Sequence, residues 1–469
     1  MEQEQTPLYD TLVNFTKQNP ISLHVPGHKN GEIFPVKDFY DRILQLDLTE
    51  LSGMDDLHAP TGAIAEAQEL AADFFQSDHT FFLVGGSTAG NLAMILAACS
   101  NGDKVIVQRN CHKSIMNGLE LAGAHPVFIS PMYDETVDRY TNPEIHTLET
   151  TLKEHLDAKA VMLTYPDYFG KTYPIQEMIK AAHAYNIPVL VDEAHGVHFS
   201  LGEPFPPSAL SLGADAVVQS AHKMAPAMTM GAFLHVAKPS RISKERLAHY
   251  LQMVQSSSPS YPLMASLDIS RKFLATMTGP KIQEVLASAA HVKQVLQASN
   301  KWRLVPSDDP VKMTLQMDKG ISAKETAALF EQENIYPELT THNQILFIHG
   351  LAPFPHNSRL EKTAKTVNEQ LKKRDNHDII EGKDLFMKSI QELELSYQKM
   401  DELQQIFVPF HKAIGYIAAE AIIPYPPGIP LILKGEKVRE AHMEMITHLK
   451  QQQVSIQKWE KHGMMIFQQ

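Results

Sequence analysis

Asp192 and Lys223 are two residues whose types and spacing could perform chemistry together. Each follows a short apolar run rich in β-branched side chains, Pro188–Val191 before the acid and Ala216–Val218 before the lysine. Such a run fits a strand that is buried on both faces of a parallel sheet. Because ligands of open α/β sheets bind beyond the carboxyl ends of the strands, we expect the two side chains to meet in one crevice.

A lysine and a carboxylate in one crevice suit pyridoxal 5'-phosphate. The lysine can form a Schiff base with the cofactor aldehyde, and the carboxylate can hold the pyridine nitrogen protonated so that the ring accepts electrons. The alternative interpretation is structural, because acids and lysines at strand ends are common surface residues. The rest of the sequence has to decide between the two.

A glycine-rich turn follows another apolar run. Residues 81–98 are typical of a strand, the turn Gly85–Gly90 and a helix rich in Ala, Leu and Met. Glycines let the backbone approach a ligand, and the hydroxyls of Ser87 and Thr88, with helix amide groups, can hold a phosphate. The turn is neither a Walker loop nor the dinucleotide fingerprint. Together with Asp192 and Lys223, it indicates a phosphate-bearing cofactor.

Two of these segments, DEAHG (192–196) and SAHK (220–223), resemble the Orn/Lys/Arg decarboxylase family, which has the aspartate-aminotransferase type of fold. The resemblance covers nearly the whole chain, from about residue 6. Further blocks agree in the same order, among them HVPGHKNG from His24, DDLH from Asp55, NCHKS from Asn110, SPSY from Ser258 and IIPYPPGIPLILKGE from Ile422. Larger bacterial members carry an extra domain before the PGHK block, so the higher assemblies and effector control that depend on that domain are not carried over to this chain.

The resemblance implies specific roles. Lys223 would hold the cofactor, Asp192 would pair with its pyridine nitrogen and His112 would stack on its ring. Protonation of the α-carbon would come from Lys223 or His222. The expected cofactor contacts are Ser87, Thr88, Ala89, His112, Asp192, Ala194, His195, Ser220, His222, Lys223, Ser256 and Ser257, and no metal ligand is assigned.

The resemblance also implies a shared active site. In the family, the serine-rich segment before SPSY reaches the phosphate of the partner subunit, and we carry this role to Ser256 and Ser257. A homodimer would then be the minimal active unit.

Four carboxylates could face the cationic tail of a substrate, namely Asp55, Asp56, Asp167 and Glu436. Asp167 stands in PDYFG where the family commonly has PTYYG, and Glu436 lies where the family has a glutamate near the substrate entrance. Each also has an ordinary explanation, such as an acidic residue ahead of a helix, a turn cap or an exposed loop acid.

The resulting hypothesis is α-decarboxylation of a basic amino acid, most simply L-arginine to agmatine and CO2 in polyamine metabolism, with lysine or ornithine as the other substrates. Two alternatives remain open. One is another reaction on the same fold, by an aminotransferase or a lyase, although no aminotransferase-like arginine motif stands near the C-terminus. The other is a non-catalytic regulator that binds the cofactor, which an intact Lys223 and Asp192 disfavour.

The predicted fold is α/β. Strand-like and helical runs alternate between residues 81 and 236, which is typical of a doubly wound, mostly parallel sheet. We expect an N-terminal segment (1–60) that contributes to the site and the dimer, a cofactor-binding large domain (61–300) and a smaller C-terminal α+β domain (301–469). Helices are predicted over 6–19 and from about Tyr261, and residues 385–407 have helical periodicity.

Composition narrows the class of protein. A net charge of −12 argues against nucleic acid as the main partner, because phosphate binding needs a basic face. Cys99 and Cys111 are too few for a disulfide framework. The N-terminus does not read as a signal peptide, and no run of about 18 apolar residues could span a membrane. We therefore expect a cytoplasmic protein.

Overall fold

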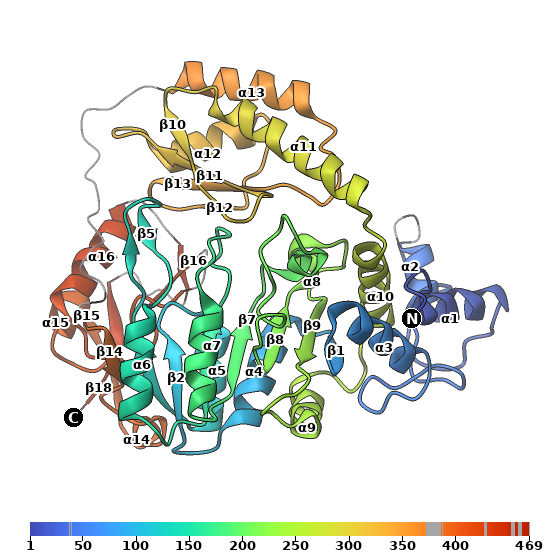
Figure 1. Ribbon diagram of the computed structural model, residues 1–469, viewed down its shortest axis with the longest axis horizontal. Helices are drawn as coiled ribbons and strands as arrows, with labels where there is room; N and C mark the ends of the chain where they lie inside the picture. The colour runs from blue at the N-terminus through green and yellow to red at the C-terminus, as the bar shows by residue number, and fades with distance from the viewer. Residues whose placement is uncertain are drawn as a thin grey trace. The chain divides into compact units, whose positions relative to one another are not determined.

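The computed structural model describes residues 1–36, 38, 40–371, 386, 388–425, 429–451, 455–457 and 462–468 (Figure 1). The chain divides into two compact units, each built from two separate stretches of sequence. The first unit contains residues 1–98 and 182–278, and the second contains residues 99–181 and 279–469. The division into 1–60, 61–300 and 301–469 stays a prediction.

Four strands of the first unit pair in the order β1-β9-β8-β7. Strands β7 and β8 are parallel, with Asp192 opposite Val218, whereas β9 is antiparallel to both β8 and β1. The two apolar runs are therefore confirmed as parallel neighbours whose carboxyl ends lie at the same edge. The bounds are β1 His79–Leu83, β7 Val189–Asp192, β8 Ala216–Gln219 and β9 Ala232–Val236.

Helix α4 (Gly86–Ala98) follows β1 as predicted and packs against β8. Gly86 begins it with φ +73°, a backbone conformation that favours glycine. At Gly90, an added Cβ would lie 2.5 Å from Cγ2 of Val218, so only glycine lets the helix approach the strand this closely. The predicted strand–turn–helix unit is thereby confirmed.

Two predicted helices of this unit are also confirmed. Helix α1 (Pro7–Lys17) has Thr6 at its N-cap and proline in its first turn, and α10 (Tyr261–Ala275) begins where Ser260 accepts a hydrogen bond from the Leu263 amide. The other helical elements are α2 Asp41–Leu46, α3 Ala63–Phe75, η1 Val197–Leu201, α8 Ala221–Met224 and α9 Lys244–Val254.

In the second unit, four strands pair in the order β6-β2-β3-β14, and β2 is parallel to both β6 and β3. Strand β14 is antiparallel to β3. The bounds are β2 Lys104–Gln108, β3 His125–Ile129, β6 Ala160–Thr164 and β14 Ile390–Glu392, with helices α5 Lys113–Ala122, α6 Ile145–Glu154 and α7 Ile175–Ala184, which crosses the unit boundary, and the hairpin of β4 Tyr133–Asp134 and β5 Arg139–Tyr140.

A second sheet in this unit has the order β10-β11-β13-β12. Figure 1 shows α11 and α13 running side by side above it. Their apolar side chains share one core with α12 and the strands, and this core includes the buried Leu315 of β11 and Phe330 of α12. The bounds are β10 Trp302–Val305, β11 Lys312–Met317, β12 Leu339–Thr340, β13 Gln344–Ile348, α11 Gly279–Gln297, α12 Ala323–Gln332 and α13 Asn357–Gln370.

The helical interpretation of residues 385–407 is wrong. The described part of this segment contains β14, the five-residue helix α14 (Tyr397–Asp401) and the start of β15 (Gln405–Pro409). Pairing of β14 with β3 and of β15 with β18 (Gly463–Phe467) overrides the helical periodicity. The remaining elements are α15 Phe410–Ala413, β16 Ile423–Tyr425, α16 Glu440–Gln451 and β17 Ser455–Gln457. None of the helices in the described ranges is long and apolar enough to cross a membrane.

Candidate active site

Lys223 lies in α8, directly beyond the carboxyl end of β8. Its Nζ is 3.1 Å from Nε2 of His195, a side chain only 6% exposed that follows the end of β7. Pairing of β7 with β8 brings these residues together, as expected for side chains beyond the ends of parallel strands. The Lys223 amine is therefore held beside an imidazole at the predicted crevice.

Asp192, the last residue of β7, is 4% exposed. Its Oδ2 accepts a hydrogen bond of 2.9 Å from Nδ2 of Asn91 on α4, and its Oδ1 accepts one of 3.1 Å from the Ala194 amide. These two donors orient the carboxylate. Asn91 is not among the residues predicted from the sequence, although a single amide side chain in a helix that is apolar beyond its first turn was a signal for it.

The glycine-rich turn carries a pair of hydroxyl groups. Ser220 Oγ donates to Ser87 Oγ at 2.9 Å, in the first turn of α4, where helix amides favour an anion. Gln255 Oε1 accepts from the amides of Val84 at 2.7 Å and Gly85 at 3.4 Å, and these bonds stabilise the start of the turn. Thr88 is exposed and Ala89 is buried.

His222 points its Nδ1 at the Gly231 carbonyl, 3.0 Å away. A carbonyl only accepts, so this nitrogen carries a proton and the neutral ring has its lone pair on Nε2. Ser256 and Ser257 are exposed, and the Ser256 carbonyl accepts from His58 Nε2 at 2.9 Å.

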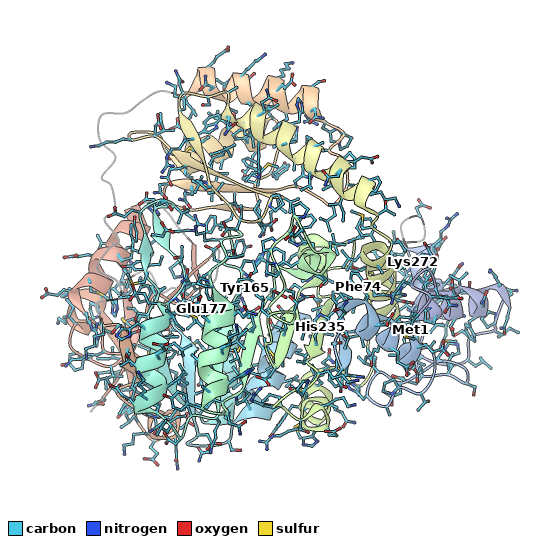
Figure 2. All side chains as sticks on the ribbon, viewed as in Figure 1. Met1, Phe74, Tyr165, Glu177, His235 and Lys272 are labelled. Atoms are coloured by element: carbon cyan, nitrogen blue, oxygen red, sulfur yellow. The ribbon has the colours of Figure 1, made fainter. Side chains whose placement is uncertain are left out.

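A buried hydrogen-bonded chain lies behind Asp192 and Ser220. Glu193, fully buried, accepts from Ser208 Oγ at 2.8 Å, the Ala209 amide at 2.7 Å and Gln219 Nε2 at 2.5 Å. Burial raises the pKa of Glu193 to about 8. Gln219 Oε1 then accepts from Nε2 of His235, whose Nδ1 accepts from Thr80. Burial lowers the pKa of His235, labelled in Figure 2, to about 3, so its ring is neutral.

His112 belongs to the second unit, where it is the N-cap of α5. Its Nδ1 accepts from the Ser114 amide at 3.2 Å. This bond fixes the ring at the end of the loop that follows β2. Its stacking on a cofactor ring stays a prediction.

Asp55 is a helix cap. The carboxylate is 6% exposed and accepts from five backbone amides at 2.8–3.1 Å, those of residues 56, 61, 62, 64 and 65. These amides include the first turn of α3, so the structural interpretation of this acid is the better supported one. Asp56, by contrast, is exposed, and within the described ranges its carboxylate accepts a local hydrogen bond from the His58 amide.

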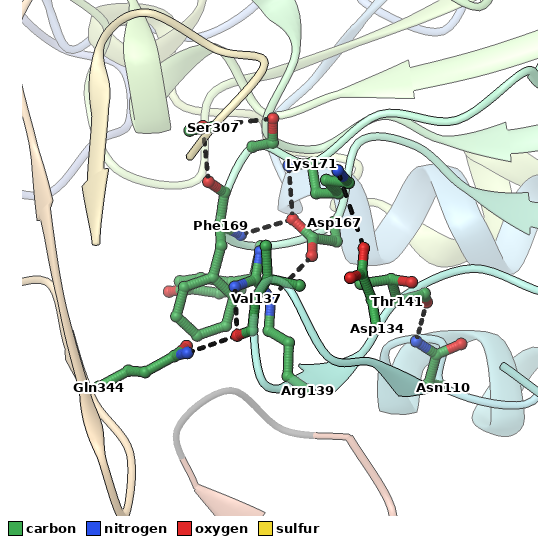
Figure 3. Close-up of polar contacts among 12 residues, drawn as sticks. Asn110, Asp134, Val137, Arg139, Thr141, Asp167, Phe169, Lys171, Ser307 and Gln344 are labelled. Carbon is green, nitrogen blue, oxygen red and sulfur yellow. Dashed lines mark hydrogen bonds and ion pairs between the residues drawn. The ribbon is translucent and has the colours of Figure 1, made fainter. Parts of the chain in front are cut away.

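Asp167 holds its own loop together, as Figure 3 shows. It accepts from the amides of Phe169 and Lys171 at 2.9 and 2.8 Å and from Arg139 Nε at 3.2 Å. The Arg139 guanidinium also lies 4.3 Å from the centre of the Phe169 ring. Asp167, the residue that departs from PTYYG, therefore makes hydrogen bonds within its own turn.

Glu436 is buried rather than an exposed loop acid. Its Oε2 is 2.9 Å from Nη2 of Arg109, and its Oε1 accepts from Gln391 at 2.9 Å. Burial alone would raise the pKa of Glu436, but the charges of Arg109 and His442, with the hydrogen bonds from Gln391 and the Leu433 amide, together outweigh it and the pKa is lowered. Residues 426–428 of the proline-rich block before it lie outside the described residues.

The first-unit residues fit pyridoxal phosphate. They supply a primary amine, a buried and oriented carboxylate, and hydroxyl groups at a helix N-terminus that follows a glycine turn. These are the groups that the aldehyde, the pyridine nitrogen and the phosphate of this cofactor require.

Comparison with known proteins agrees with this geometry. Residues 6–311 match the major domain of Orn/Lys/Arg decarboxylases and residues 383–460 match their C-terminal domain. A Bacillus subtilis protein named only as uncharacterized YaaO is 41% identical over 95% of this chain and 94% of its own. A Bacillus cereus protein named arginine decarboxylase is 34% identical over 93% of this chain and 97% of its own.

A solved structure of the Francisella novicida lysine decarboxylase LdcF is similar over 98% of this chain and 81% of that chain, with a TM-score of 0.81 at 18% identity. This likeness shows the fold and confirms the predicted fold class. The match to the major-domain family covers well over half of the sequence. The chain therefore belongs to the Orn/Lys/Arg decarboxylase family of pyridoxal-phosphate-dependent amino-acid decarboxylases.

Proposed function

We propose that this protein converts L-arginine to agmatine and CO2 in polyamine metabolism, with Lys223 holding pyridoxal phosphate. The assignment of arginine as the substrate rests on the Bacillus cereus relative, which is named arginine decarboxylase and matches over nearly its whole length. When bound, the cofactor supplies an aldehyde for the amine and a conjugated ring for the electron pair that CO2 leaves behind.

Lys223 and His195 act at the aldehyde end. An amine attacks an aldehyde only when it is unprotonated, and His195 Nε2, 3.1 Å away, can accept the proton that the ammonium group must lose. After CO2 leaves, one proton is added at the α-carbon of the substrate. The proposed donor is Lys223 or His222, which are adjacent in α8.

Asp192 acts at the opposite end of the ring. Asn91 and the Ala194 amide hold its carboxylate, so that it can accept a hydrogen bond from a protonated pyridine nitrogen. Ser87, Thr88, Ala89 and Ser220 bind the phosphate at the N-terminus of α4.

The proposed active unit is a homodimer, located in the cytoplasm. Ser256 and Ser257 are exposed and would contact the phosphate of the partner subunit. The segment around the PGHK block exposes apolar side chains, with Ile21 at 87%, Leu23 at 93% and Ile33 at 68%, as expected of a surface that a second copy covers. Cys99 and Cys111 are both buried and are not joined in a disulfide, which suits a reducing compartment.

Asp56 is the proposed contact of the substrate guanidinium among the four candidate acids. Asp55, Asp167 and Glu436 are engaged by their own chain, whereas Asp56 is exposed and keeps most of its acceptor capacity.

The test is CO2 and amine release from arginine, lysine and ornithine by the purified protein loaded with pyridoxal phosphate. Agmatine is the expected product. Cadaverine or putrescine would change the substrate but keep the reaction, and a loaded protein that releases no CO2 from any of the three would overturn decarboxylation. Lys223→Ala should lose the visible absorbance of the lysine-bound cofactor, and Lys180→Ala, an exposed site on α7, should keep it.

The shared site has its own test, in which two inactive variants are mixed. Lys223→Ala lacks the amine, and Ser256→Ala combined with Ser257→Ala lacks the predicted phosphate contacts. If these serines serve the partner, mixed dimers contain one intact site and regain activity. If the serines serve their own subunit, mixing restores nothing.

A further inference from the structure

A cavity of about 200 Å³ lies in the first unit. Four separate segments build it, and none of them contains Lys223. Its walls are largely apolar and include Leu57, Phe81, Phe82 and Leu251. It lies beside β1 and α9, and Gln68 of α3 is part of its lining.

Gln68 is the unusual member of this lining. Its side chain is 2% exposed, and neither Nε2 nor Oε1 has a hydrogen-bond partner among the described residues. Buried side-chain amides are nearly always paired, because an unpaired donor or acceptor loses its bonds to water without compensation. A polar occupant of the cavity would supply what the chain itself does not.

The charges around the cavity favour a neutral occupant. Lys244 and Glu245 both line it and carry opposite signs, so neither an anion nor a cation gains from the pair. Burial lowers the pKa of His79, another lining residue, to about 4, which keeps that ring neutral near pH 7.

We propose that this cavity is a binding site for a small neutral aromatic carboxamide. Such a group offers one acceptor and two donors side by side, which is the complement of the Gln68 side chain. Its flat ring would pack between the apolar walls that Phe81 and Leu251 provide. A carboxylate would leave Gln68 Oε1 facing a second acceptor, and a hydrocarbon would leave both amide atoms unpaired.

The site adjoins the turn that is proposed to hold the cofactor phosphate, and its consequence for that turn rests on the proposed function. Gln255 lines the cavity, and its Oε1 accepts from the amides of Val84 and Gly85. His58, also in the lining, donates to the Ser256 carbonyl. A ligand that stiffens this wall should tighten binding of the cofactor, and by linkage the cofactor should tighten ligand binding by the same factor.

The first experiment measures benzamide binding to the cofactor-loaded protein by calorimetry, with benzoate and toluene as matched probes. Benzamide should bind at least tenfold more tightly than either. Equal affinities for the three probes, or no benzamide binding, would overturn the proposal. The measurement needs no turnover, so failure of the arginine reaction would not affect it.

Two variants assign the binding to the cavity. Gln68→Met keeps the side-chain length but removes both polar atoms, and it should lower benzamide affinity about tenfold. Ala248→Phe fills the cavity from α9 and should abolish binding. Gln294→Met, an exposed site on α11, is the matched control and should bind as the wild type does.

Thermal unfolding without benzamide separates a ligand site from a hidden structural partner. If Gln68 is unpaired in the free protein, Gln68→Met should raise the melting temperature. A clear fall would mean that a bound water or a second copy of the chain already satisfies the amide, and it would overturn the proposal. A benzamide-soaked crystal with only water at Gln68 would do the same.

Discussion

Nζ of Lys223 lies 3.1 Å from Nε2 of His195, although the two residues follow different strands. The contact depends on the parallel register of β7 and β8, which sets Asp192 opposite Val218. It joins a reactive amine to a base that is only 6% exposed. An imidazole in this position can accept a proton from the amine before the cofactor is attached.

Replacing His195 by Asn should slow attachment of pyridoxal phosphate to the apoprotein by roughly a hundredfold, because the base beside the amine is lost. Stopped-flow absorbance after cofactor addition measures this rate directly, before any turnover. His146→Asn, on an exposed face of α6, is the control and should react at the wild-type rate. An unchanged rate in His195→Asn would remove the role given to this imidazole.

Replacing Asp192 by Asn should lower kcat by roughly ten- to a hundredfold, since a hydrogen bond to a charged group contributes about 1.5–3 kcal/mol. Asn91→Ala should act in the same direction but less, because it loosens the carboxylate without removing its charge. Steady-state kinetics of both variants give the comparison. A larger effect from Asn91→Ala than from Asp192→Asn would contradict the assignment.

Glu193 should make the protein less stable as the pH rises. Its folded-state pKa of about 8 is above the unfolded value of about 4.3, so the folded protein binds the proton more tightly. Its contribution to stability is therefore complete below the unfolded pKa and is lost as the pH rises through the folded pKa. Melting temperatures of the wild type should fall between pH 5 and 9, and Glu193→Gln should flatten this slope.

The control for Glu193 is Glu177→Gln, an exposed acid on α7 that Figure 2 labels. It should keep the slope of the wild type. A Glu193→Gln protein whose melting temperature falls as steeply as the wild type would show that another group causes the alkaline loss.

Much of the site could be predicted from the sequence, because it depends on local patterns. Two β-branched runs with polar ends gave β7 and β8, and the glycine turn before an apolar helix gave the start of α4. Asn91, Gln255 and Glu193 could not be assigned in the same way. Their roles depend on hydrogen bonds to residues 101, 171 and 26 positions away, and no local pattern encodes these distances.

The C-terminal region shows most clearly where local sequence patterns stop predicting the structure. Residues 385–407 have helical periodicity, but β14 pairs with β3, a strand that lies more than 250 positions earlier in the chain. The partner of Glu436, Arg109, is 327 positions away. Pairing with distant residues decides the secondary structure and the contacts of such segments, and local sequence patterns do not encode this pairing.

Asp55 and Asp56 should separate into structural and substrate-binding acids. Asp55→Ala removes a cap from five amides and should cost about 1–2 kcal/mol of unfolding free energy. Asp56→Asn should leave stability unchanged and raise KM for arginine while kcat stays similar. Denaturant unfolding and steady-state kinetics on both variants test the pair. If neither variant changes KM, Asp56 is not the contact of the substrate tail.

The ion pair of Arg109 and Glu436 should be needed for folding of the C-terminal region. Both side chains are nearly fully buried, and Arg109 also donates to the carbonyls of Pro430 and Leu431. Glu436→Gln or Arg109→Met alone leaves a buried charge and should cost about 3–5 kcal/mol. The double variant Arg109→Met/Glu436→Gln should cost less than the sum of the two, because it leaves no uncompensated charge of the pair.

The same pair predicts an acid-sensitive step. The folded-state pKa of Glu436 is lowered, so its contribution to stability is present above the unfolded pKa of about 4.3 and is lost as the pH falls through the folded value. Denaturation midpoints should therefore drop below about pH 4 in the wild type and drop less in the double variant. Equal acid sensitivity in the two proteins would mean that the pair titrates alike in the folded and unfolded states.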